Sequence, residues 1–514
     1  MLTAVSSGRP RFDSSAFDKA LKAADYERCS LLVAENTSPD AALAASMLAL
    51  RERRYVDVIG LLSDFPAVPD EFHVARDVLL GAALGSTRDF VAGARLIERA
   101  LTKLQPGKPY YDEAIYYKAA VAWMQHDYRA AEIAIGPAMT SPDANNRARA
   151  HILLSWVALR RGEILRQVDE LQKALDELDV ADIPDQYFRA NALFTLALLC
   201  RELPLREISD RVRSIHEALP WTPGLALERF QVTRLLAAVD ELQGNELAAF
   251  AGFKSAARFA PSEHWSVLCF ADRASLARNT GENAFAAELL QEAHDMAQRL
   301  SWNVAGEERS ALLVLAELFA DENPAIAEQY LARFRSLSAS VIPLLSYGTD
   351  PRLRGLEAYS QGIAWLRLGD SGEGKAALSE AWSIFEDFDY GWRAALCALH
   401  LYETTRDRRW LQRATRKIAP WADSWIARRI TEVTNASCVS LELVPPAKRE
   451  VLELVRAGRR NSEIARVLGR SPNTVRNQIA QLFQTFNVKS RAELVSILAK
   501  QSTVTRLRPR TAKV

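Results

Sequence analysis

The breaks between apolar helical segments recur along most of the chain, and they constrain the fold more than any other feature. From about residue 17 to residue 433, apolar residues follow helical spacing with almost no strand-like alternation. The early breaks carry an aromatic residue at intervals of 29, 35 and 38 residues, namely Tyr26, Tyr55, Phe90 and Tyr128. A two-helix hairpin cannot bury its own apolar face, so neighbouring hairpins must stack. This region is therefore predicted to be an α-solenoid.

The later breaks carry glycine, at Gly162, Gly244, Gly281 and Gly369, and each is followed by another helical segment. Glycine is the usual residue just past the end of a helix. The stretch 365–370, Trp-Leu-Arg-Leu-Gly-Asp, resembles the turn of the tetratricopeptide repeat. The resemblance extends over roughly four-fifths of the chain and implies about ten stacked hairpins, which vary in length.

Residues 369–375 also satisfy GxxxxGK, the phosphate-binding loop pattern. A working loop of that kind follows a β-strand, and a Ser or Thr after its lysine holds magnesium. Here the preceding residues have helical spacing, and Ala376 occupies the magnesium position. We therefore interpret these glycines as a hairpin turn and expect no cofactor.

All eleven tryptophans lie before residue 434. Two interpretations stay open: packing within the hairpins, or a ligand or peptide groove around Trp392, Trp410, Trp421 and Trp425.

The five cysteines are far apart and form no CxxC pair, which argues against disulfides or a zinc site. No apolar run approaches the roughly 18 residues of a membrane span, and the first residues do not resemble a secretory signal. The protein is therefore expected in the cytoplasm.

Charge is distributed unevenly between the two ends of the chain. From residue 441 onward there are 15 Lys and Arg against 5 Asp and Glu, which leaves 50 basic and 59 acidic residues before that point. A basic segment behind an acidic body indicates a module that binds a polyanion.

This basic end is predicted to form four short helices joined by tight turns. Gly458 and Gly469 end the first two helices, Asn461 is expected to cap the second, and Ser471 followed by Pro472 begins the third. The predicted helices cover residues 446–457, 461–468, 472–486 and 490–499.

The third helix carries the side chains suited to DNA. Its buried face is predicted from spacings of 4, 3 and 4 residues between Val475, Ile479, Leu482 and Phe486. Arginine can bridge guanine O6 and N7, asparagine can bridge adenine N6 and N7, and alanine permits close approach. The side chains predicted to face outward are Asn473, Arg476, Asn477, Ala480 and Gln484.

Phosphate contacts are expected around this helix. Lys489, Ser490 and Arg491 begin the fourth helix, where free backbone N–H groups favour an anion. Arg459 and Arg460 precede the second helix and are further candidates. The basic residues of the predicted disordered tail can add nonspecific contacts; they are Arg506, Arg508, Arg510 and Lys513.

The ordered combination of these residues resembles the LuxR-type helix-turn-helix family. The shared pattern is Gly458, then Asn461-x-Glu463-Ile464-Ala465-x-x-Leu468, Ser471-x-x-Thr474-Val475-Arg476, and Asn487-Val488-x-Ser490-Arg491-Ala492-Glu493-Leu494. The resemblance implies that the third helix enters the major groove and that the fourth, through Leu494 and Leu498, helps two copies pair. The DNA-binding residues expected on this basis are Asn461, Asn473, Thr474, Arg476, Asn477, Ala480, Gln484, Lys489, Ser490 and Arg491.

The sequence departs from the family pattern in two places. Where the family usually opens its first helix with a Thr-x-x-Glu capping box, this chain has Pro445 and Lys448. These residues cannot form the box, and the lysine opposes the helix dipole, at a cost of about 1 kcal/mol. Gln478 replaces a ring residue common in the third helix.

The predicted protein is all-α, a tetratricopeptide-like solenoid followed by a four-helix LuxR-type domain. Its expected parts are a disordered start, the repeats, a linker, the DNA-binding domain and a basic tail, at residues 1–16, 17–433, 434–443, 444–500 and 501–514. No phospho-receiver, acyl-lactone sensor or ATPase pattern precedes the module, so the repeats are left as the sensor.

We interpret the chain as a transcription regulator, an activator by resemblance, that binds double-stranded DNA as a homodimer. Its repeats would receive a protein, peptide or small-molecule signal. The alternative is a scaffold or anti-activator that sequesters another regulator and has a weak DNA module. No enzyme is expected, because no nucleophile, paired-acid or metal pattern emerges from the sequence.

Overall fold

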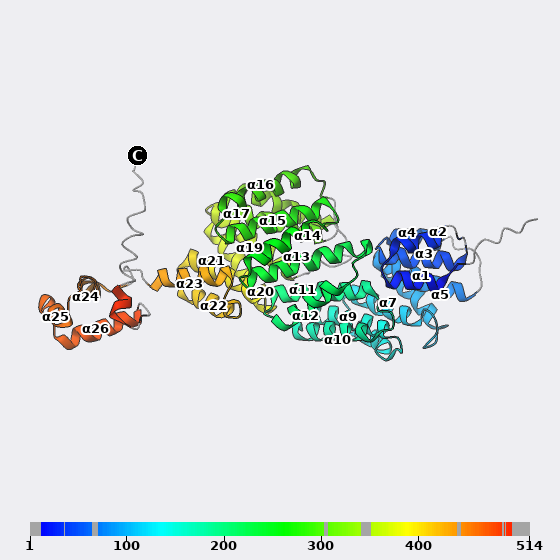
Figure 1. Ribbon diagram of the computed structural model, residues 1–514, viewed down its shortest axis with the longest axis horizontal. Coiled ribbons are helices and arrows are strands. Elements are labelled where there is room, and N and C mark those ends of the chain that lie inside the picture. The colour runs from blue at the N-terminus through cyan, green and yellow to red at the C-terminus, as the bar shows by residue number, and fades with distance from the viewer. Residues whose placement is uncertain are drawn as a thin grey trace, which may run out of the picture. The chain divides into compact units, whose positions relative to one another are not determined.

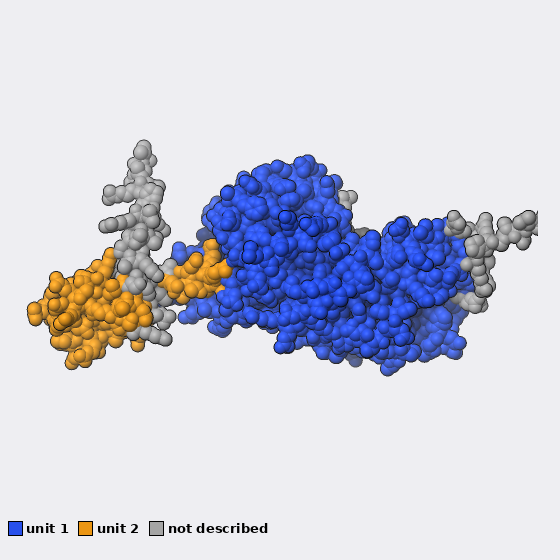
Figure 2. Space-filling view, viewed as in Figure 1, with its two compact units in different colours: residues 1–425 blue, residues 426–514 orange. Residues whose placement is uncertain are grey.

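The computed structural model describes residues 12–34, 36, 38–63, 70–302, 307–340, 351–438, 444–485, 488 and 490–495. All regular secondary structure in these residues is helical. The chain divides into unit 1, residues 1–425, and unit 2, residues 426–514 (Figure 2). The predicted disordered tail lies outside the described residues, and the first helix begins at Ser14, inside the predicted disordered start.

Unit 1 is a tetratricopeptide-like α-solenoid, in which consecutive helices pair and the pairs stack in chain order (Figure 1). In the described part of the chain, eleven such hairpins can be followed. The first six are α1 (Ser14–Lys22) with α2 (Tyr26–Ala34), α3 (Pro39–Arg51) with α4 (Tyr55–Ser63), α5 (Asp70–Ser86) with α6 (Phe90–Leu101), α7 (Tyr111–Met124) with α8 (Tyr128–Ile135), α9 (Ala144–Arg161) with α10 (Ile164–Val180), and α11 (Gln186–Glu202) with α12 (Arg206–Ala218).

The remaining five hairpins complete unit 1. They are α13 (Ala226–Leu242) with α14 (Glu246–Ala257), α15 (Glu263–Asn279) with α16 (Asn283–Arg299), α17 (Ser310–Glu322) with α18 (Pro324–Ser340), α19 (Pro351–Arg367) with α20 (Ser371–Asp387), and α21 (Gly391–Thr405) with α22 (Arg408–Ile418). Short 3-10 segments lie between some of these helices, at Gly136–Thr140, Pro223–Leu225, Glu307–Arg309 and Ala419–Trp421.

The predicted breaks are confirmed as the turns inside the hairpins. Most turns hold one residue with positive φ, which reverses the chain between the two helices: Ala24, Arg53, Arg88, His126, Gly162, Gly244, Gly281, Gly369 and Arg406. An aspartate often follows and caps the next helix, as when Asp89 Oδ1 accepts a hydrogen bond of 3.1 Å from the Ala92 amide.

The stretch that matches the phosphate-binding pattern is one of these turns. Helix α19 precedes it, where a phosphate-binding loop would follow a strand. Gly369 has a φ of +91°, and Asp370 caps α20 by accepting from the Glu373 amide. The turn geometry accounts for the glycine without a nucleotide.

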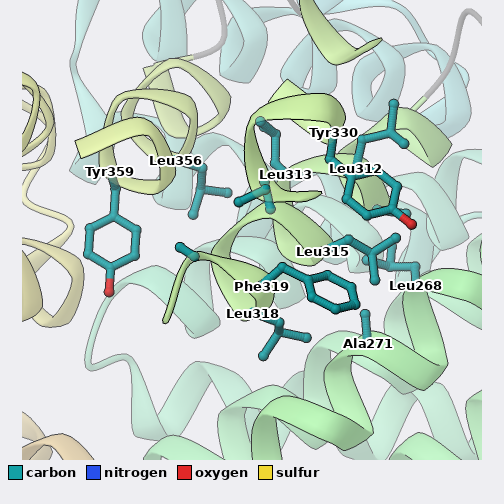
Figure 3. Close-up of a cluster of buried hydrophobic side chains, with 14 of the residues drawn as sticks. Leu268, Ala271, Leu312, Leu313, Leu315, Leu318, Phe319, Tyr330, Leu356 and Tyr359 are labelled. Atoms are coloured by element: carbon teal, nitrogen blue, oxygen red, sulfur yellow. The ribbon is translucent and has the colours of Figure 1, made fainter. Parts of the chain in front are cut away.

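The core of unit 1 runs between successive hairpins. Figure 3 shows Leu312, Leu315 and Phe319 of α17 beside Leu268 and Ala271 of α15, with Leu356 of α19 on the other side. Helix α17 thus buries one face against the preceding hairpin and another against the next. This arrangement is why a single hairpin of this sequence would not be stable alone.

The last six hairpins close into a ring, which we call the closed ring and define by their first helices, α11, α13, α15, α17, α19 and α21. Helix α11 contacts α13, and α17 contacts both α15 and α19. Hydrogen bonds connect α13 to α15, from Arg234 to Asp272, and α19 to α21, between Tyr359 and His400. Helix α21 returns to α11, although the two helices are about 190 residues apart in sequence.

A buried ion pair joins the two ends of the ring. Arg393 of α21 donates two hydrogen bonds, of 2.7 and 3.1 Å, to the carboxylate of Glu202 on α11. The Trp392 indole donates to the Arg201 carbonyl at 3.0 Å. Burial alone would raise the pKa of Glu202, but the neighbouring Arg393 and Arg201 cations lower it below its ordinary value. Glu202 is therefore held as an anion in the protein interior.

The tryptophans support the packing interpretation. Trp392 and Trp421 are buried, and Trp410 and Trp425 are partly buried against the core. The rings of Trp382 and Trp410 meet edge to face with centroids 5.3 Å apart.

Unit 2 contains a small module built from three complete helices and the start of a fourth in the described residues. Helix α23 (Trp425–Cys438) leads into it and covers part of the predicted linker. The module consists of α24 (Pro446–Arg456), α25 (Asn461–Leu468), α26 (Pro472–Thr485) and a final helical stretch at 491–495. In the described parts of both units, no helix combines the length and hydropathy that a membrane span requires.

Candidate nucleic-acid interface

Helices α25 and α26 form the two arms of a helix-turn-helix. Gly469 ends α25 with a φ of +65°, a left-handed conformation that glycine adopts readily. The Ser471 hydroxyl then accepts a hydrogen bond of 3.1 Å from the Thr474 amide, which confirms Ser471 as the predicted cap of α26. Pro472 is the first residue of that helix, where its missing N–H costs nothing.

The inward face of α26 is confirmed for its described residues. Val475, Ile479 and Leu482 are buried in the core of the module with residues of α24 and α25. Phe486, the fourth predicted member, lies outside the described residues. Phe483 packs against the same core, one residue after Leu482. This packing fixes the rotation of α26 about its own axis.

The opposite face of α26 is exposed to solvent. The exposed side chains include all six predicted site residues of this helix, Asn473, Thr474, Arg476, Asn477, Ala480 and Gln484, together with Gln481, which was not predicted. In the part of the chain that the structure describes, the Arg476 guanidinium makes no hydrogen bond or ion pair. The Thr474 hydroxyl is already engaged with that of Ser471 at 2.8 Å. The helix therefore presents one free cation among amide groups.

Arg470, which the sequence analysis did not single out, connects α26 to α24. Its guanidinium donates to Gln478 Oε1 at 3.2 Å and to Glu450 Oε2 at 3.1 Å. Gln478, at the position where the family often has a ring, thus receives a hydrogen bond from the turn. The position of Arg470 directly before the cap was the only signal in the sequence.

Asn461 does not cap α25, so that expectation is wrong. The residue at the cap position is Arg460, whose amide donates to Glu463 Oε2 at 2.8 Å. Asn461 is the first residue of the helix, and its side-chain oxygen accepts from Arg491 Nη1 at 3.1 Å. Arg491 also donates to the Arg459 carbonyl. The start of the last helix is thereby attached to the start of α25.

The predicted phosphate contacts are brought together only in part. Ser490 Oγ accepts from the Glu493 amide at 3.2 Å and so caps the last helical stretch. Arg459 and Arg460 are exposed in the turn before α25. Lys489 lies outside the described residues, as does the basic tail.

Leu494 was expected to help two copies pair, and the structure contradicts this. Its side chain is fully buried in the module's own core, together with Val451, Val475 and Val488. The module is small and needs an apolar residue from its last helix to complete its core. Leu498 lies outside the described residues.

The start of α24 has the weak cap that the sequence predicts. Pro445 occupies the cap position and makes no side-chain hydrogen bond to the helix. The Arg449 side chain instead donates to the Val444 carbonyl at 2.7 Å. The helix therefore depends on its packing, with Val451, Leu452 and Val455 buried.

Comparison with protein families agrees with this geometry. Residues 447–498 match the model of the GerE family, described as bacterial regulatory proteins, luxR family. The C-terminal module is a LuxR-type helix-turn-helix domain. The match covers α25, α26 and nearly all of α24, and it makes DNA the ligand expected of the LuxR-type domain.

No curated protein matches the chain in sequence. Among solved structures, the chain is similar to a Rap protein complexed with competence and sporulation factor, with 12% identity over 71% of this chain and 99% of that one, at a TM-score of 0.43. It is also similar to the apo form of RapI, with 11% identity, 77% and 98% coverage and a TM-score of 0.40. The APC/C hetero-tetramer Cut9-Hcn1 gives 13% identity, 94% and 95% coverage and a TM-score of 0.30.

Proposed function

We propose that this protein is a sequence-specific DNA-binding transcription regulator of the cytoplasm whose helical repeats receive a signal. The observation that carries the proposal is the exposed face of α26, with a free Arg476 beside Asn477 and Ala480. Arginine and asparagine at neighbouring outward positions suit guanine and adenine edges in the major groove. Buried Val475, Ile479 and Leu482 hold this face outward.

The finer parts of the proposal follow the family resemblance. The protein acts as an activator, binds a two-fold-symmetric site as a homodimer, and receives a protein, peptide or small-molecule signal through unit 1. Ser490, Arg491, Lys489 and Asn461 lie near the DNA backbone, with Arg459 and Arg460 as further contacts. Since Leu494 is buried, the two copies pair through other residues.

Selection of DNA fragments from a randomised pool by the full-length protein tests the proposal. We expect one enriched sequence, with an affinity that falls steeply between low and moderate salt. Arg476→Ala should weaken binding to the selected sequence by about 1–3 kcal/mol and relax the preference. The matched control is Arg258→Ala in unit 1, an exposed arginine at the end of α14, which should leave selection unchanged.

The alternative scaffold function predicts the opposite result in the selection experiment. A scaffold or anti-activator that sequesters another regulator would enrich no sequence, and Arg476→Ala would leave its residual DNA affinity unchanged. Either result would overturn the proposed regulator.

A further inference from the structure

Every first helix of the closed ring contributes one polar side chain to a single group, which we call the inner polar cluster. Its members are Arg201, Glu241, Asn279, Glu317, Tyr359 and His400. Burial raises the pKa of Glu241 to about 7, and Glu317 adds to this rise while Asn279 and Arg201 oppose it. Burial also raises the pKa of Glu317, against the opposing influence of Arg393, Arg278, Arg201 and His400. Side chains from opposite sides of the ring therefore share one electrostatic environment.

Most charged and polar groups in this part of the ring have partners. Arg234 pairs with Asp272, and Arg393 with Glu202. Within the cluster, Asn279 donates to Glu241 at 3.0 Å. The Tyr359 hydroxyl lies 3.1 Å from His400 Nε2, within hydrogen-bonding distance.

Two members of the cluster have opposite charges and no such partner. Across the described residues, neither Arg201 nor Glu317 makes a side-chain hydrogen bond or ion pair, and the Arg201 guanidinium lies 6.0 Å from the Trp392 ring. Both side chains are half-buried, so solvent reaches them. Burial, together with the neighbouring Arg393, lowers the pKa of Arg201 to about 10. A recessed charge without a partner is unfavourable, and a ligand that supplies the partner gains that energy.

We propose that the inner polar cluster binds a small zwitterion of the α-amino-acid type. Its carboxylate pairs with Arg201, whose planar guanidinium matches that group, and its ammonium lies between Glu317 and Glu241. A simple anion would leave the Glu241 and Glu317 carboxylates without a counter-charge from the ligand, and a simple cation would leave Arg201 unpaired. A free amino acid and the end of a short peptide share this chemistry. If unit 1 is the sensor of the proposed regulator, this ligand is its signal, and to that extent the inference rests on the proposed function.

Calorimetric titration of the full-length protein with each proteinogenic L-amino acid, and separately with short unmodified peptides, tests the inference. We expect at least one of these probes to bind. Binding in the amino-acid series would identify a free amino acid as the ligand, and binding in the peptide series would identify a peptide end. Its N-acetyl and methyl-ester derivatives should each bind about tenfold or more weakly, because each loses one charged contact. An ammonium group also lowers the pKa of Glu241 beside Asp272, Glu317, Arg201 and Asn279, so binding near neutral pH should release protons and its heat should depend on the buffer.

Two variants and two matched controls complete the test. Arg201→Gln and Glu317→Gln should each weaken binding by about tenfold to a hundredfold. Arg258→Gln, directly after α14, and Glu288→Gln, on α16, change exposed side chains that are not part of the inner polar cluster, and both variants should bind as the wild type does. Circular dichroism checks the folding of each variant. Glu317→Gln keeps the shape of the side chain and carries the test if Arg201→Gln does not fold.

The inference is overturned if no amino acid or peptide binds, or if both cluster variants bind as tightly as the controls. Since the titration contains no DNA, these results are independent of fragment selection by the LuxR-type domain. A protein that selects DNA but binds no zwitterion would refute the inference and leave the proposed regulator standing.

Discussion

The two units differ in where they place charged and polar side chains: unit 1 buries several of them, whereas the LuxR-type domain exposes them to solvent. Among the residues that the structure describes, every buried charged side chain belongs to unit 1, where Glu202, Asp272 and Arg393 lie in the interior. The core of the LuxR-type domain is apolar, and the polar side chains of α26 face solvent. A domain that reads DNA needs its donors outside, whereas stacked hairpins can enclose charges between helices. The difference agrees with the proposed ligand sites, which lie on the surface of the LuxR-type domain and in the interior of unit 1.

We expect the greatest loss of stability from a change to the ion pair that closes the ring. Arg393→Met leaves the Glu202 carboxylate buried without its partner, so unit 1 should lose about 3–5 kcal/mol of unfolding free energy. Denaturant unfolding followed by tryptophan fluorescence measures this loss, because all eleven tryptophans precede residue 434. The double variant Glu202→Leu/Arg393→Met should recover most of it. A loss below about 1 kcal/mol, typical of exposed pairs, would show that the ring does not depend on this contact.

The second effect is a pH dependence specific to unit 1. The pKa of Glu241 is raised from 4.5 to about 7 in the folded protein, so folding favours its protonated form. The resulting stabilisation is complete below pH 4.5 and is lost as the pH rises through 7. Since one pKa unit corresponds to about 1.4 kcal/mol and the side chain is half-buried, we expect a loss of about 2 kcal/mol across this interval.

Comparison with Glu241→Gln isolates this contribution, since the amide cannot titrate. Unfolding free energies of the two proteins, measured across the interval, should converge at its acidic end and separate toward its alkaline end. Parallel pH profiles would mean that Glu241 titrates as it does in the unfolded chain.

A smaller effect is expected in the LuxR-type domain. Arg491→Met removes the hydrogen bonds to Asn461 and to the Arg459 carbonyl, and should cost about 1.5 kcal/mol of domain stability without DNA. Amide hydrogen exchange in α25 measures this cost. Arg466→Met, at an exposed position on the same helix, is the matched control and should exchange as the wild type does. If Arg491 serves only as a phosphate contact, exchange in the DNA-free domain will not change.

The smallest effect concerns the turns of the solenoid. Arg88 is exposed and has a φ of +74°, which costs energy for any residue with a Cβ atom. Arg88→Gly should stabilise unit 1 by about 0.5 kcal/mol, after allowance for the greater freedom of glycine in the unfolded chain. Gly281→Ala, at a φ of +89° with open space around it, should shift thermal unfolding in the opposite direction. If both variants shift the unfolding temperature in the same direction, strain at the positive φ angle does not explain the stability of these turns.

Features that follow local spacing could be predicted from the sequence. The turns at Gly244 and Gly281, and the buried face of α26, agree with the structure because helical periodicity places side chains within a few residues of one another. The cap of α25 and the role assigned to Leu494 were wrong for a different reason. Arg491 binds Asn461 from 30 residues away, and Leu494 completes a core to which three other helices contribute.

Local sequence patterns were enough to predict a series of stacking helices that ends in a LuxR-type domain with Arg476 and Asn477 on one outward face. The closure of six hairpins into a ring, and the electrostatic influence of Arg201 on Glu317, could be seen only once the helices were placed in space. The contact between Glu202 and Arg393 joins residues that are 191 positions apart, and local periodicity does not indicate which distant helices will touch. Closure depends on the small rotation that each hairpin adds, summed over the whole ring.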